Sequence, residues 1–366
     1  MILALLFWGC TSLVDDSGEE PSLNWTWLSA DTHVHSSLGS NDTDGLGLDN
    51  VLETAMRTAG LDIVWITDHS NSQGSMECVD VEDCPNQGPE ITSGDWPSGV
   101  WLGSEISPWA GDENSDQATG HIGCLPIDGV AFDVDHFVDR PVGTVTGGDA
   151  VQQCIDGDGF AILAHPFGPT SWVSFDWSTT DFHAMEIFNG GAGFDPSDAK
   201  AVEAWQQGRA DGYPWIPVGG SDSHHWGTEA PGTLLQSALG WPRTELGHVG
   251  TEAPIDALRQ GRTIVSDGNT HLRLFASAKG QVVGPGERMA GPFILHVEAL
   301  TEEPNMRLQV LRLPDFSVLD LALDATLAHH CLELAEPGLY IARVWPEEGA
   351  NFMQRGFGLT NTIELF

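Results

Sequence analysis

The chain repeats one arrangement, in which a stretch with helical spacing of apolar side chains runs directly into a short apolar segment. Residues 48–60 (LDNVLETAMRTAG) lead into LDIVWI, residues 147–159 (GGDAVQQCIDGDG) into FAILA, and residues 195–212 into PWIPVGG. Short apolar segments of this kind are typical of strands covered on both faces, and helices that alternate with them indicate an α/β fold.

Each of these apolar segments ends at side chains that can bind a metal. Asp68 and His69 follow the first segment, His165 follows the second, and Asp222 and His224 follow the third. In parallel α/β barrels the carboxyl ends of the strands open onto one face, which carries the chemistry. We therefore expect these side chains to meet.

A further pair of imidazoles lies in the segment ADTHVHSS. His33 and His35 are one residue apart, so in a strand both point to the same face. Glu105 in VWLGSEIS and His121 in TGHIGCLPI are metal-capable as well, but they fit the strand pattern less regularly. An isolated HxH equally fits an edge strand with solvated histidines, so the metal interpretation depends on the rest of the chain.

The pattern changes near residue 271. Short, partly alternating runs such as HLRLFASA and PFILHVEAL are separated by turns rich in Gly, Pro and Glu, which is typical of an antiparallel sandwich. We predict an N-terminal segment over residues 1–28, an α/β domain over 29–270 and a small all-β sandwich-like domain over 271–366.

The charge balance limits the possible partners. The 366 residues include 53 acidic and 14 basic side chains, a formal net charge of −39. A surface this acidic repels polyanions, so we expect no binding to nucleic acid or to an anionic membrane face. The oligomeric state is left open.

The N-terminal segment MILALLFWGC is apolar but shorter than the roughly 20 residues that cross a bilayer. It resembles the end of a bacterial lipoprotein signal, in which Cys10 carries the lipid and the acidic stretch behind it tethers the domain. This predicts an exported protein, periplasmic or anchored to a membrane. An ordinary hydrophobic N-terminus is the alternative, because no positive region precedes the apolar run.

The other cysteines suggest a small disulfide. Cys78 and Cys84 flank VDVED closely enough to close a loop in an oxidising compartment. No CxxC occurs, which argues against a zinc-thiolate site. Among Cys124, Cys154 and Cys331 we expect an unpaired cysteine that acts as a small buried hydrophobe.

Seven short motifs together resemble the polymerase-and-histidinol-phosphatase (PHP) superfamily over roughly residues 29–270. In order they are HVHS at 33–36, TDH at 67–69, GSE at 103–105, His121, AHP at 164–166, EIFN at 186–189 and GSDSH at 220–224. LRQGRTIVSDG and GFGLTNTIEL further resemble the branch of this superfamily that contains the carbaryl hydrolases, which add a β domain to the barrel.

The resemblance implies a distorted (β/α)7 barrel that binds two or three divalent ions, commonly Zn, Mn or Fe, and hydrolyses esters. Asp44, next to Gly45, is our choice for an acidic ligand after HxH, with Asp42 as the competitor. The full set of implied metal ligands is His33, His35, Asp44, His69, Glu105, His121, His165, Asp222 and His224.

Roles within this set follow from metal chemistry. Glu105 is expected to bridge two cations, so that both polarise one water molecule, which then attacks the substrate. We count His69 as catalytic too, and we expect Asp68, beside it, to orient a ligand. Glu186 and Asn189 are expected to shape the pocket floor.

Other candidate residues carry open alternatives. His225 could shuttle a proton or be an exposed neighbour without a task. Arg243 could clamp a phosphate or form an ordinary surface ion pair. Trp172 and Trp177, near His165, could form an apolar rim for substrate or belong to the core.

The sequence therefore predicts a metal-dependent hydrolase of a small phosphate mono- or diester that acts through metal-bound hydroxide. One alternative keeps the metal centre but cleaves a carboxylester or carbamate, because phosphate pockets usually carry more Arg or Lys. The other is a surface lipoprotein whose metal-stabilised barrel serves only as a scaffold for binding.

Overall fold

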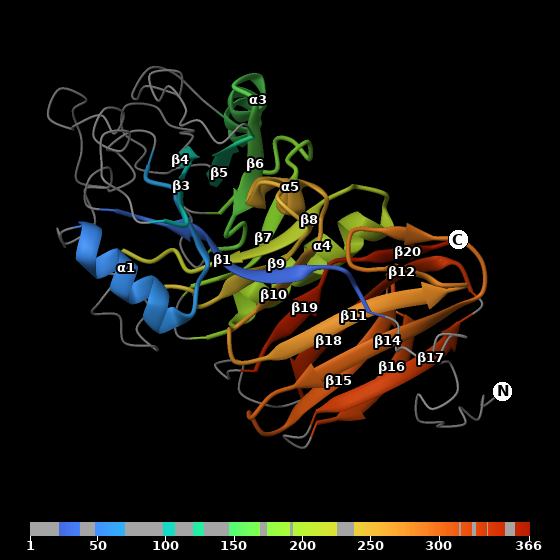
Figure 1. The fold of residues 1–366 in the computed structure, drawn as a ribbon. Coiled ribbons are helices and arrows are strands. Elements are labelled where there is room, and N and C mark those ends of the chain that lie inside the picture. The colour runs from blue at the N-terminus through green and yellow to red at the C-terminus, as the bar shows by residue number, and fades with distance from the viewer. Residues whose placement is uncertain are drawn as a thin grey trace, which may run out of the picture.

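The computed structural model describes residues 22–36, 48–69, 98–106, 120–127, 146–168, 174–190, 193–224, 238–314, 316–323, 327–334, 336–347 and 356–366. The chain is mixed α/β with several sheets and a second, mostly-β part, as predicted. In Figure 1 the helices α1, α3 and α5 accompany the strands drawn from blue to yellow, and the orange and red strands form the mostly-β part.

One five-stranded sheet in the α/β part has the order β4-β5-β6-β7-β8. The strands β6 (Gly159–Ala164), β7 (Ala184–Asn189) and β8 (Ile216–Gly220) are parallel to one another. β5 (His121–Pro126) runs antiparallel to both β6 and β4 (Ser104–Ile106). Nearly all residues of these strands are buried, which explains their apolar sequences.

A second, larger sheet continues from the α/β part into the mostly-β part. β1 (Thr26–Val34) is parallel to β2 (Ile63–Ile66), which is parallel to β3 (Val100–Leu102). On its other side β1 pairs antiparallel with β9 (Arg243–His248), and β9 with β10 (Thr263–Ser266). β10 then pairs with β19 (Gly358–Thr360), so strands on both sides of residue 270 share this sheet.

Two isolated parallel bridges join these sheets at the strand ends. Val34 is bridged to Ser223, and His69 to Glu105. Closure into a seven-stranded barrel is not shown, because the strands of the described ranges fall into separate sheets. Besides the bridges, side-chain hydrogen bonds such as that between the Gly219 N–H and the Thr244 hydroxyl connect these sheets. The bridges nevertheless bring the ends of β1 and β2 to the ends of β8 and β4.

The mostly-β part packs two sheets around one apolar core. A four-stranded sheet has the order β12-β11-β14-β17, formed by Gln281–Val283, His271–Ala278, Phe293–Leu300 and Ala328–Leu334. Facing it are β15 (Met306–Arg312), β16 (Phe316–Ala322) and β18 (Gly338–Pro346), with the short strands β13 (Arg288–Met289) and β20 (Ile363–Leu365). Alternate side chains of both sheets enter the shared core.

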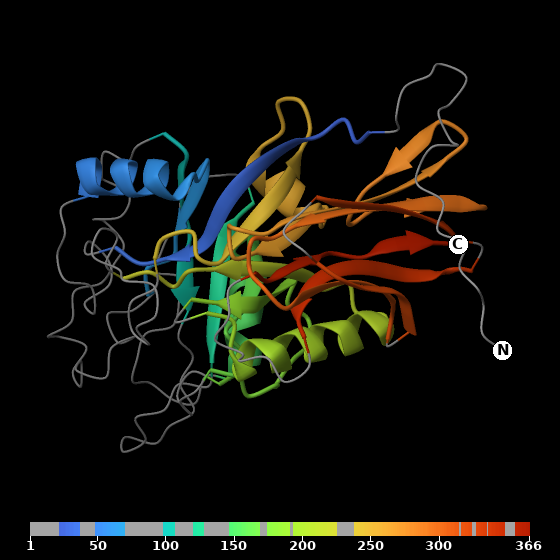
Figure 2. The ribbon, with the colours of Figure 1, turned by 90° about the horizontal axis from the view of Figure 1, so that it is seen from below.

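The helices α1 (Leu48–Ala59), α3 (Gly147–Asp156), α4 (Pro196–Ala210) and α5 (Pro254–Arg259) accompany the strands. α4 begins at Asp195, whose carboxylate accepts from the backbone N–H groups of Ser197 and Asp198. Val202 and Trp205 of α4 share an apolar cluster with Ile341 of the mostly-β part. Figure 2 shows α4 lying along strands of both parts, so this helix helps to join them.

The prediction for three of the cysteines was wrong. Cys124 of β5 and Cys154 of α3 form a disulfide, and both are fully buried. Cys331 is disulfide-bonded too. None of the three is therefore a free buried hydrophobe, and Cys10, Cys78 and Cys84 lie outside the described ranges.

No helix within the described ranges is long and apolar enough to cross a membrane.

Candidate metal centre

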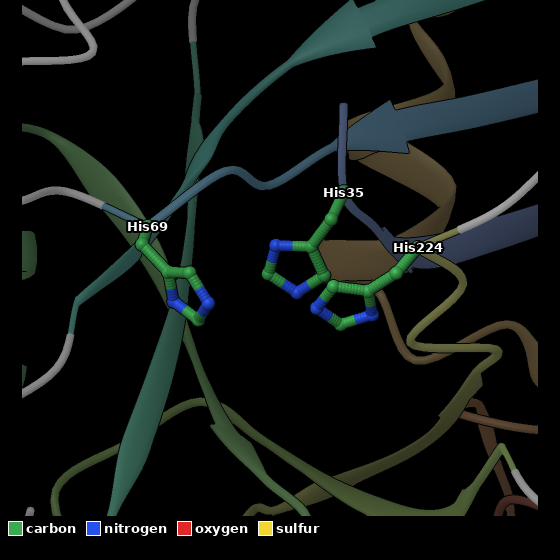
Figure 3. Close-up of side chains that lie close together, drawn as sticks. All are labelled: His35, His69 and His224. Atoms are coloured by element: carbon green, nitrogen blue, oxygen red, sulfur yellow. The ribbon is translucent and has the colours of Figure 1, made fainter. Parts of the chain in front are cut away.

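Eight of the nine predicted ligands meet at the ends of strands. His33 and His35 lie at the end of β1, His69 follows β2, and Glu105 belongs to β4. His121 begins β5, His165 follows β6, and Asp222 and His224 follow β8. Figure 3 shows the rings of His35, His69 and His224 gathered together from these separate segments. Asp44 and its competitor Asp42 lie outside the described residues.

Glu105 is the centre of the cluster. Its Oε1 lies 2.8 Å from Nδ1 of His121, 3.2 Å from Nε2 of His33 and 3.4 Å from Nε2 of His165. Its Oε2 lies 2.8 Å from Nδ1 of His69. The two oxygens thus face different histidines, the arrangement that a bridging carboxylate requires.

Asp222 closes the other side of the cluster. Its Oδ1 lies 3.1 Å from Nε2 of His35 and 3.5 Å from Nε2 of His33, and its Oδ2 lies 4.0 Å from Nε2 of His165. Asp222 and His165 have backbone φ values of 52° and 24°, in a region that residues other than glycine rarely adopt. Strain of this kind is found at functional sites, where the surrounding structure enforces it.

The donor atoms fall into overlapping groups that could each hold an ion, with all donor atoms of a group within 4.8 Å of one another. One group consists of imidazoles alone, and the others combine imidazole with carboxylate. The groups are His35–His69–His224, His33–His35–Glu105, His33–His165–Asp222 and Glu105–His121–His165. Because the groups share residues, the cluster suits several neighbouring ions, whose identity the donors do not fix.

The carboxylates of Glu105, which is buried, and Asp222, whose side chain is 25% exposed, both stay charged. Burial by itself would raise the pKa of Glu105, but the adjacent His121, His33 and His69 hold it well below its ordinary value. Burial likewise opposes ionisation of Asp222, and His33 together with its neighbouring imidazoles holds its pKa well below the usual range. The cluster therefore presents negative charge in a buried site.

The two imidazoles at the end of β1 differ. Burial, together with the nearby His224 and His69, lowers the pKa of His35 to about 3, so this ring is neutral at pH 7 and can offer a nitrogen lone pair to a metal. Burial would also lower the pKa of His33, but Asp222 and the other adjacent carboxylates raise it well above its ordinary value. A cation at this point would take the place of the proton that His33 holds.

The residues fit bound cations on independent geometric grounds. Both carboxylate oxygens of Glu105 are buried without a hydrogen-bond partner. Nε2 of His33 lies 3.1 Å from Nε2 of His35, so both nitrogens point into the cluster, where a proton or a cation can lie between them. Buried oxygens that accept no hydrogen bond are costly, and a bound cation would compensate them. The donors are also those that Zn, Mn and Fe prefer.

Glu186 has a more specific place than the predicted pocket floor. Its Oε1 lies 3.2 Å from Nδ1 of His33, and its Oε2 accepts from the backbone N–H of His165 at 2.8 Å and from Nδ2 of Asn189 at 2.9 Å. A carboxylate at Nδ1 leaves Nε2 of His33 as the donor toward the cluster. Gly220 permits this approach, since a Cβ there would lie 2.8 Å from Oε1 of Glu186.

Asp68 holds the chain beside the ligands. Its Oδ1 accepts from the backbone N–H of Ser36 and its Oδ2 from the Ser36 hydroxyl, both at 2.5 Å. Asp68 thus fixes the segment after His35 against the segment before His69. These two bonds orient ligand-bearing backbone rather than an imidazole.

Asp31 was missed in the sequence analysis. This buried carboxylate accepts from the backbone N–H groups of Gly240 at 2.7 Å, Ser221 at 2.9 Å and His33 at 3.3 Å. Burial raises its pKa to about 6 in spite of these bonds. An acidic residue inside an otherwise strand-like segment two positions before His33 is the one sequence signal that could have identified it.

The remaining candidates lie apart from the cluster or outside the described residues. Nη2 and Nε of Arg243 donate to the backbone carbonyls of Ala59 and Gly240, so its described hydrogen bonds are with backbone and not with the cluster. Trp177 is 38% exposed and its ring contacts Phe167. His225 and Trp172 fall outside the described ranges.

A separate group in the mostly-β part also has metal-capable side chains. His296, His329 and Cys331 have donor atoms within 4.8 Å of one another. Cys331 is disulfide-bonded, however, so its sulfur is not the thiolate that binds metals.

Comparisons with known proteins give one structural similarity. No family model matches the chain, and no curated protein matches it. The fold is similar to the crystal structure of a two-domain protein from Bacteroides vulgatus that contains a predicted PHP-like metal-dependent phosphoesterase. The TM-score is 0.41 and the sequence identity 15%, with 94% of this chain and 97% of that chain covered. The interpretation of the metal centre rests on its own geometry.

Proposed function

We propose that the protein is a metal-dependent phosphoesterase that hydrolyses a small phosphate mono- or diester. The observation that carries this proposal is the buried Glu105 carboxylate, whose oxygens make no hydrogen bond and lie 2.8 Å from Nδ1 of His121 and Nδ1 of His69. Divalent ions bound there would act as Lewis acids and lower the pKa of coordinated water.

Residues of the chain would hold the ions and fix the positions of their ligands. Glu105 would span neighbouring ions, and Asp222 would hold the side of the cluster that is more open to solvent, since 25% of its side chain is exposed. Glu186 and Asp68 fix ligand-bearing segments, which keeps the donor geometry constant during turnover. The exposed edge at Asp222 and His224 is the route that we assign to the substrate.

A carboxylester or carbamate hydrolase is the second candidate, favoured by one observation. Every described ion pair of the cluster joins a histidine to a carboxylate, and Arg243 is bonded to backbone carbonyls instead. Phosphate sites often add an arginine to the metals, which carboxylester sites do not need.

Three substrates separate these candidates. Metal-loaded protein is incubated with p-nitrophenyl phosphate, bis-p-nitrophenyl phosphate and p-nitrophenyl acetate, beside His165→Ala and a matched histidine control, His329→Ala, in the mostly-β part. We expect hydrolysis of a phosphate ester that His165→Ala abolishes and His329→Ala preserves. Hydrolysis of the acetate without hydrolysis of either phosphate would support the second candidate. If none of the three substrates is hydrolysed, both hydrolase candidates fail, and the alternative of a surface lipoprotein that only binds is favoured.

We also propose export with a lipid anchor at Cys10. The buried Cys124–Cys154 disulfide supports an oxidising compartment. Labelling with a radioactive fatty acid should mark the wild-type chain and not Cys10→Ser, and equal labelling of both would contradict the anchor.

A further inference from the structure

Asp31 of β1 lies where the two sheets of the α/β part meet. β1 and β8 belong to different sheets. Their backbones are joined beyond the end of β8, where the N–H of Asp222 donates to the carbonyl of His33 at 2.8 Å. One residue earlier, a side chain makes the connection instead, because Oδ1 of Asp31 accepts from the backbone N–H of Ser221 at 2.9 Å.

The Asp31 carboxylate joins three separate segments of backbone. Its Oδ1 accepts from the N–H groups of Ser221 and, at 3.3 Å, of His33. Its Oδ2 accepts at 2.7 Å from the N–H of Gly240, in the segment that leads into β9. Ser221 immediately precedes Asp222 in the chain. One carboxylate therefore ties the backbone of one candidate ligand, His33, to the neighbour of a second, Asp222.

The fold alone does not explain why a carboxylate lies here. Asp31 is fully buried, and no ion pair of the described residues includes it. Burying an acid that only backbone N–H groups compensate is more destabilising than burying a neutral acceptor. A carboxylate differs from a side-chain amide in having two oxygens that both accept hydrogen bonds. Asp31 can therefore hold all three segments at once, which a neutral side chain of this size cannot do.

Asp267, just after β10, makes the same pattern of hydrogen bonds away from the cluster. It is 3% exposed and accepts from the backbone N–H groups of Asn269 at 3.1 Å, Thr270 at 2.9 Å and Gly356 at 2.6 Å. Two of these donors belong to its own turn, and none is next to a candidate ligand. Asp267 therefore serves as a matched control for what such a carboxylate contributes to folding alone.

We propose that Asp31 is a positioning residue of the metal centre, which fixes the separation of His33 from Asp222 and thereby sets the affinity of the ion that these two residues share. A shift of either backbone would move a donor atom away from that ion, and metal affinity depends on such supporting contacts. The inference rests on the metal centre of the proposed function, but not on the kind of bond that the centre cleaves.

The proposal distinguishes between the candidate ion sites. His33 and Asp222 occur together in one group of donors, which His165 completes. A second group contains neither of them, so its ion should be much less sensitive to Asp31. This second group is Glu105–His121–His165.

Asp31→Ala removes all three accepted hydrogen bonds, and Asp267→Ala removes the matched three. The affinity of the full chain for Zn²⁺ is measured ion by ion through competition with a chromophoric chelator. We expect Asp31→Ala to bind one ion about 10- to 100-fold more weakly than wild type and to keep its affinity for the others. Asp267→Ala should keep every affinity, although thermal unfolding should show both variants melting below wild type.

Asp31→Asn decides the question if Asp31→Ala does not fold. The amide keeps the size of the side chain, but one of its two terminal atoms cannot accept a hydrogen bond. We expect a smaller loss of affinity for the same ion and a change in the visible spectrum of bound Co²⁺, which reports coordination geometry. Asp267→Asn should show neither. Wild-type affinities in the Asp31 variants, or equal losses in the Asp267 variants, would overturn the proposal.

Double variants identify the affected ion. Added to Asp222→Ala, Asp31→Ala should weaken binding little further, because the shared ion has already lost a ligand, whereas its effect should add to that of His121→Ala. Additivity with Asp222→Ala would refute the assignment to the shared ion. If wild type binds Zn²⁺ but hydrolyses no phosphate ester, the phosphoesterase function fails while these affinities still decide the role of Asp31. A wild type that binds no Zn²⁺ would refute both.

Discussion

The two parts of the molecule differ in the kinds of side chain that they bury. Among the described residues from 271 onward, no Asp, Glu, Lys or Arg is buried, and the buried polar side chains are His296, Thr301, Thr360, Asn361 and Thr362. In the α/β part, the strand ends bury charged and polar groups instead, among them Asp31, His33, Glu105 and Glu186. The first interior stabilises the fold by removing apolar surface from water, and the second is stabilised only when its charges compensate one another or bind ions.

Because the α/β part buries charged groups that could bind ions, we expect Glu105→Gln to have the largest effect on metal content and activity. The neutral amide cannot bridge two ions, so we expect loss of bound metal and a drop in hydrolysis of about a thousandfold. Metal content is measured by elemental analysis of protein purified without added metal. Glu298→Gln, in the mostly-β part, is the control and should keep both metal and activity. Retention of metal in Glu105→Gln would show that the buried carboxylate is not needed for metal binding, and the proposed difference between the two interiors would fail.

A core substitution in the mostly-β part should lower stability and leave the metal content unchanged, whereas Glu105→Gln should lose metal. Leu295 is fully buried in its apolar core. Leu295→Ala should lower the free energy of unfolding by about 3 kcal/mol through lost burial and a cavity, with unchanged metal content. Denaturant unfolding measures the first and elemental analysis the second. Leu295→Met is the matched control with nearly full stability, and metal loss in Leu295→Ala would show that the two interiors are coupled.

Within the α/β part, Glu186→Gln tests whether the carboxylate beside His33 contributes to metal binding. The amide can donate to Nδ1 of His33, which would favour the tautomer with its lone pair away from the cluster. We expect metal affinity to fall about 10- to 100-fold while the fold is retained. Competition with a chelator measures the affinity, and circular dichroism monitors the fold. An affinity equal to that of wild type would exclude a positioning role for Glu186.

The smallest effect concerns the one histidine buried beside the apolar core of the mostly-β part. Burial, with His329 nearby, lowers the pKa of His296 to about 4, and its Nε2 lies 2.8 Å from the Ser277 hydroxyl. The unfolded chain binds a proton below pH 6.5 that the folded chain excludes until about pH 4. Stability is therefore lost as the pH falls through this window, by about 2 kcal/mol after allowance for solvent screening.

Unfolding of wild type and His296→Gln between pH 7 and 4 measures this contribution. The variant has no imidazole at this position, so its stability should fall less steeply than that of wild type. Parallel curves for the two proteins would mean that His296 does not titrate as its burial indicates.

Eight of the nine predicted ligands, all except Asp44, could be placed together from the sequence because each one follows, or lies within, an apolar strand segment. His69, His165 and Asp222 are examples, and local chain order is enough to place them at strand ends. Pairings between distant segments could not be found in this way. Cys124 meets Cys154 only after α3 packs against β5 and β6, and no spacing rule identifies that pair.

Residue roles were less predictable than residue positions. Arg243 has the right chemistry for a phosphate clamp, but the fold directs its guanidinium to the carbonyls of Ala59 and Gly240. Asp31 gave almost no sequence signal, because its importance lies in backbone N–H groups some 190 and 209 residues away. An isolated side chain does not reveal which distant backbone groups will surround it.

The sequence by itself determined the mixed α/β composition, the mostly-β C-terminal part and the chemical identity of the candidate metal donors. Periodicity and side-chain type are local properties, and these features follow from them. Only the tertiary structure decided that Glu105 faces histidines from several strands, that Glu186 lies against His33 and that Gln206 has a buried amide without a partner. Those features depend on distances between segments far apart in the chain, which are fixed when the sheets and α4 pack together.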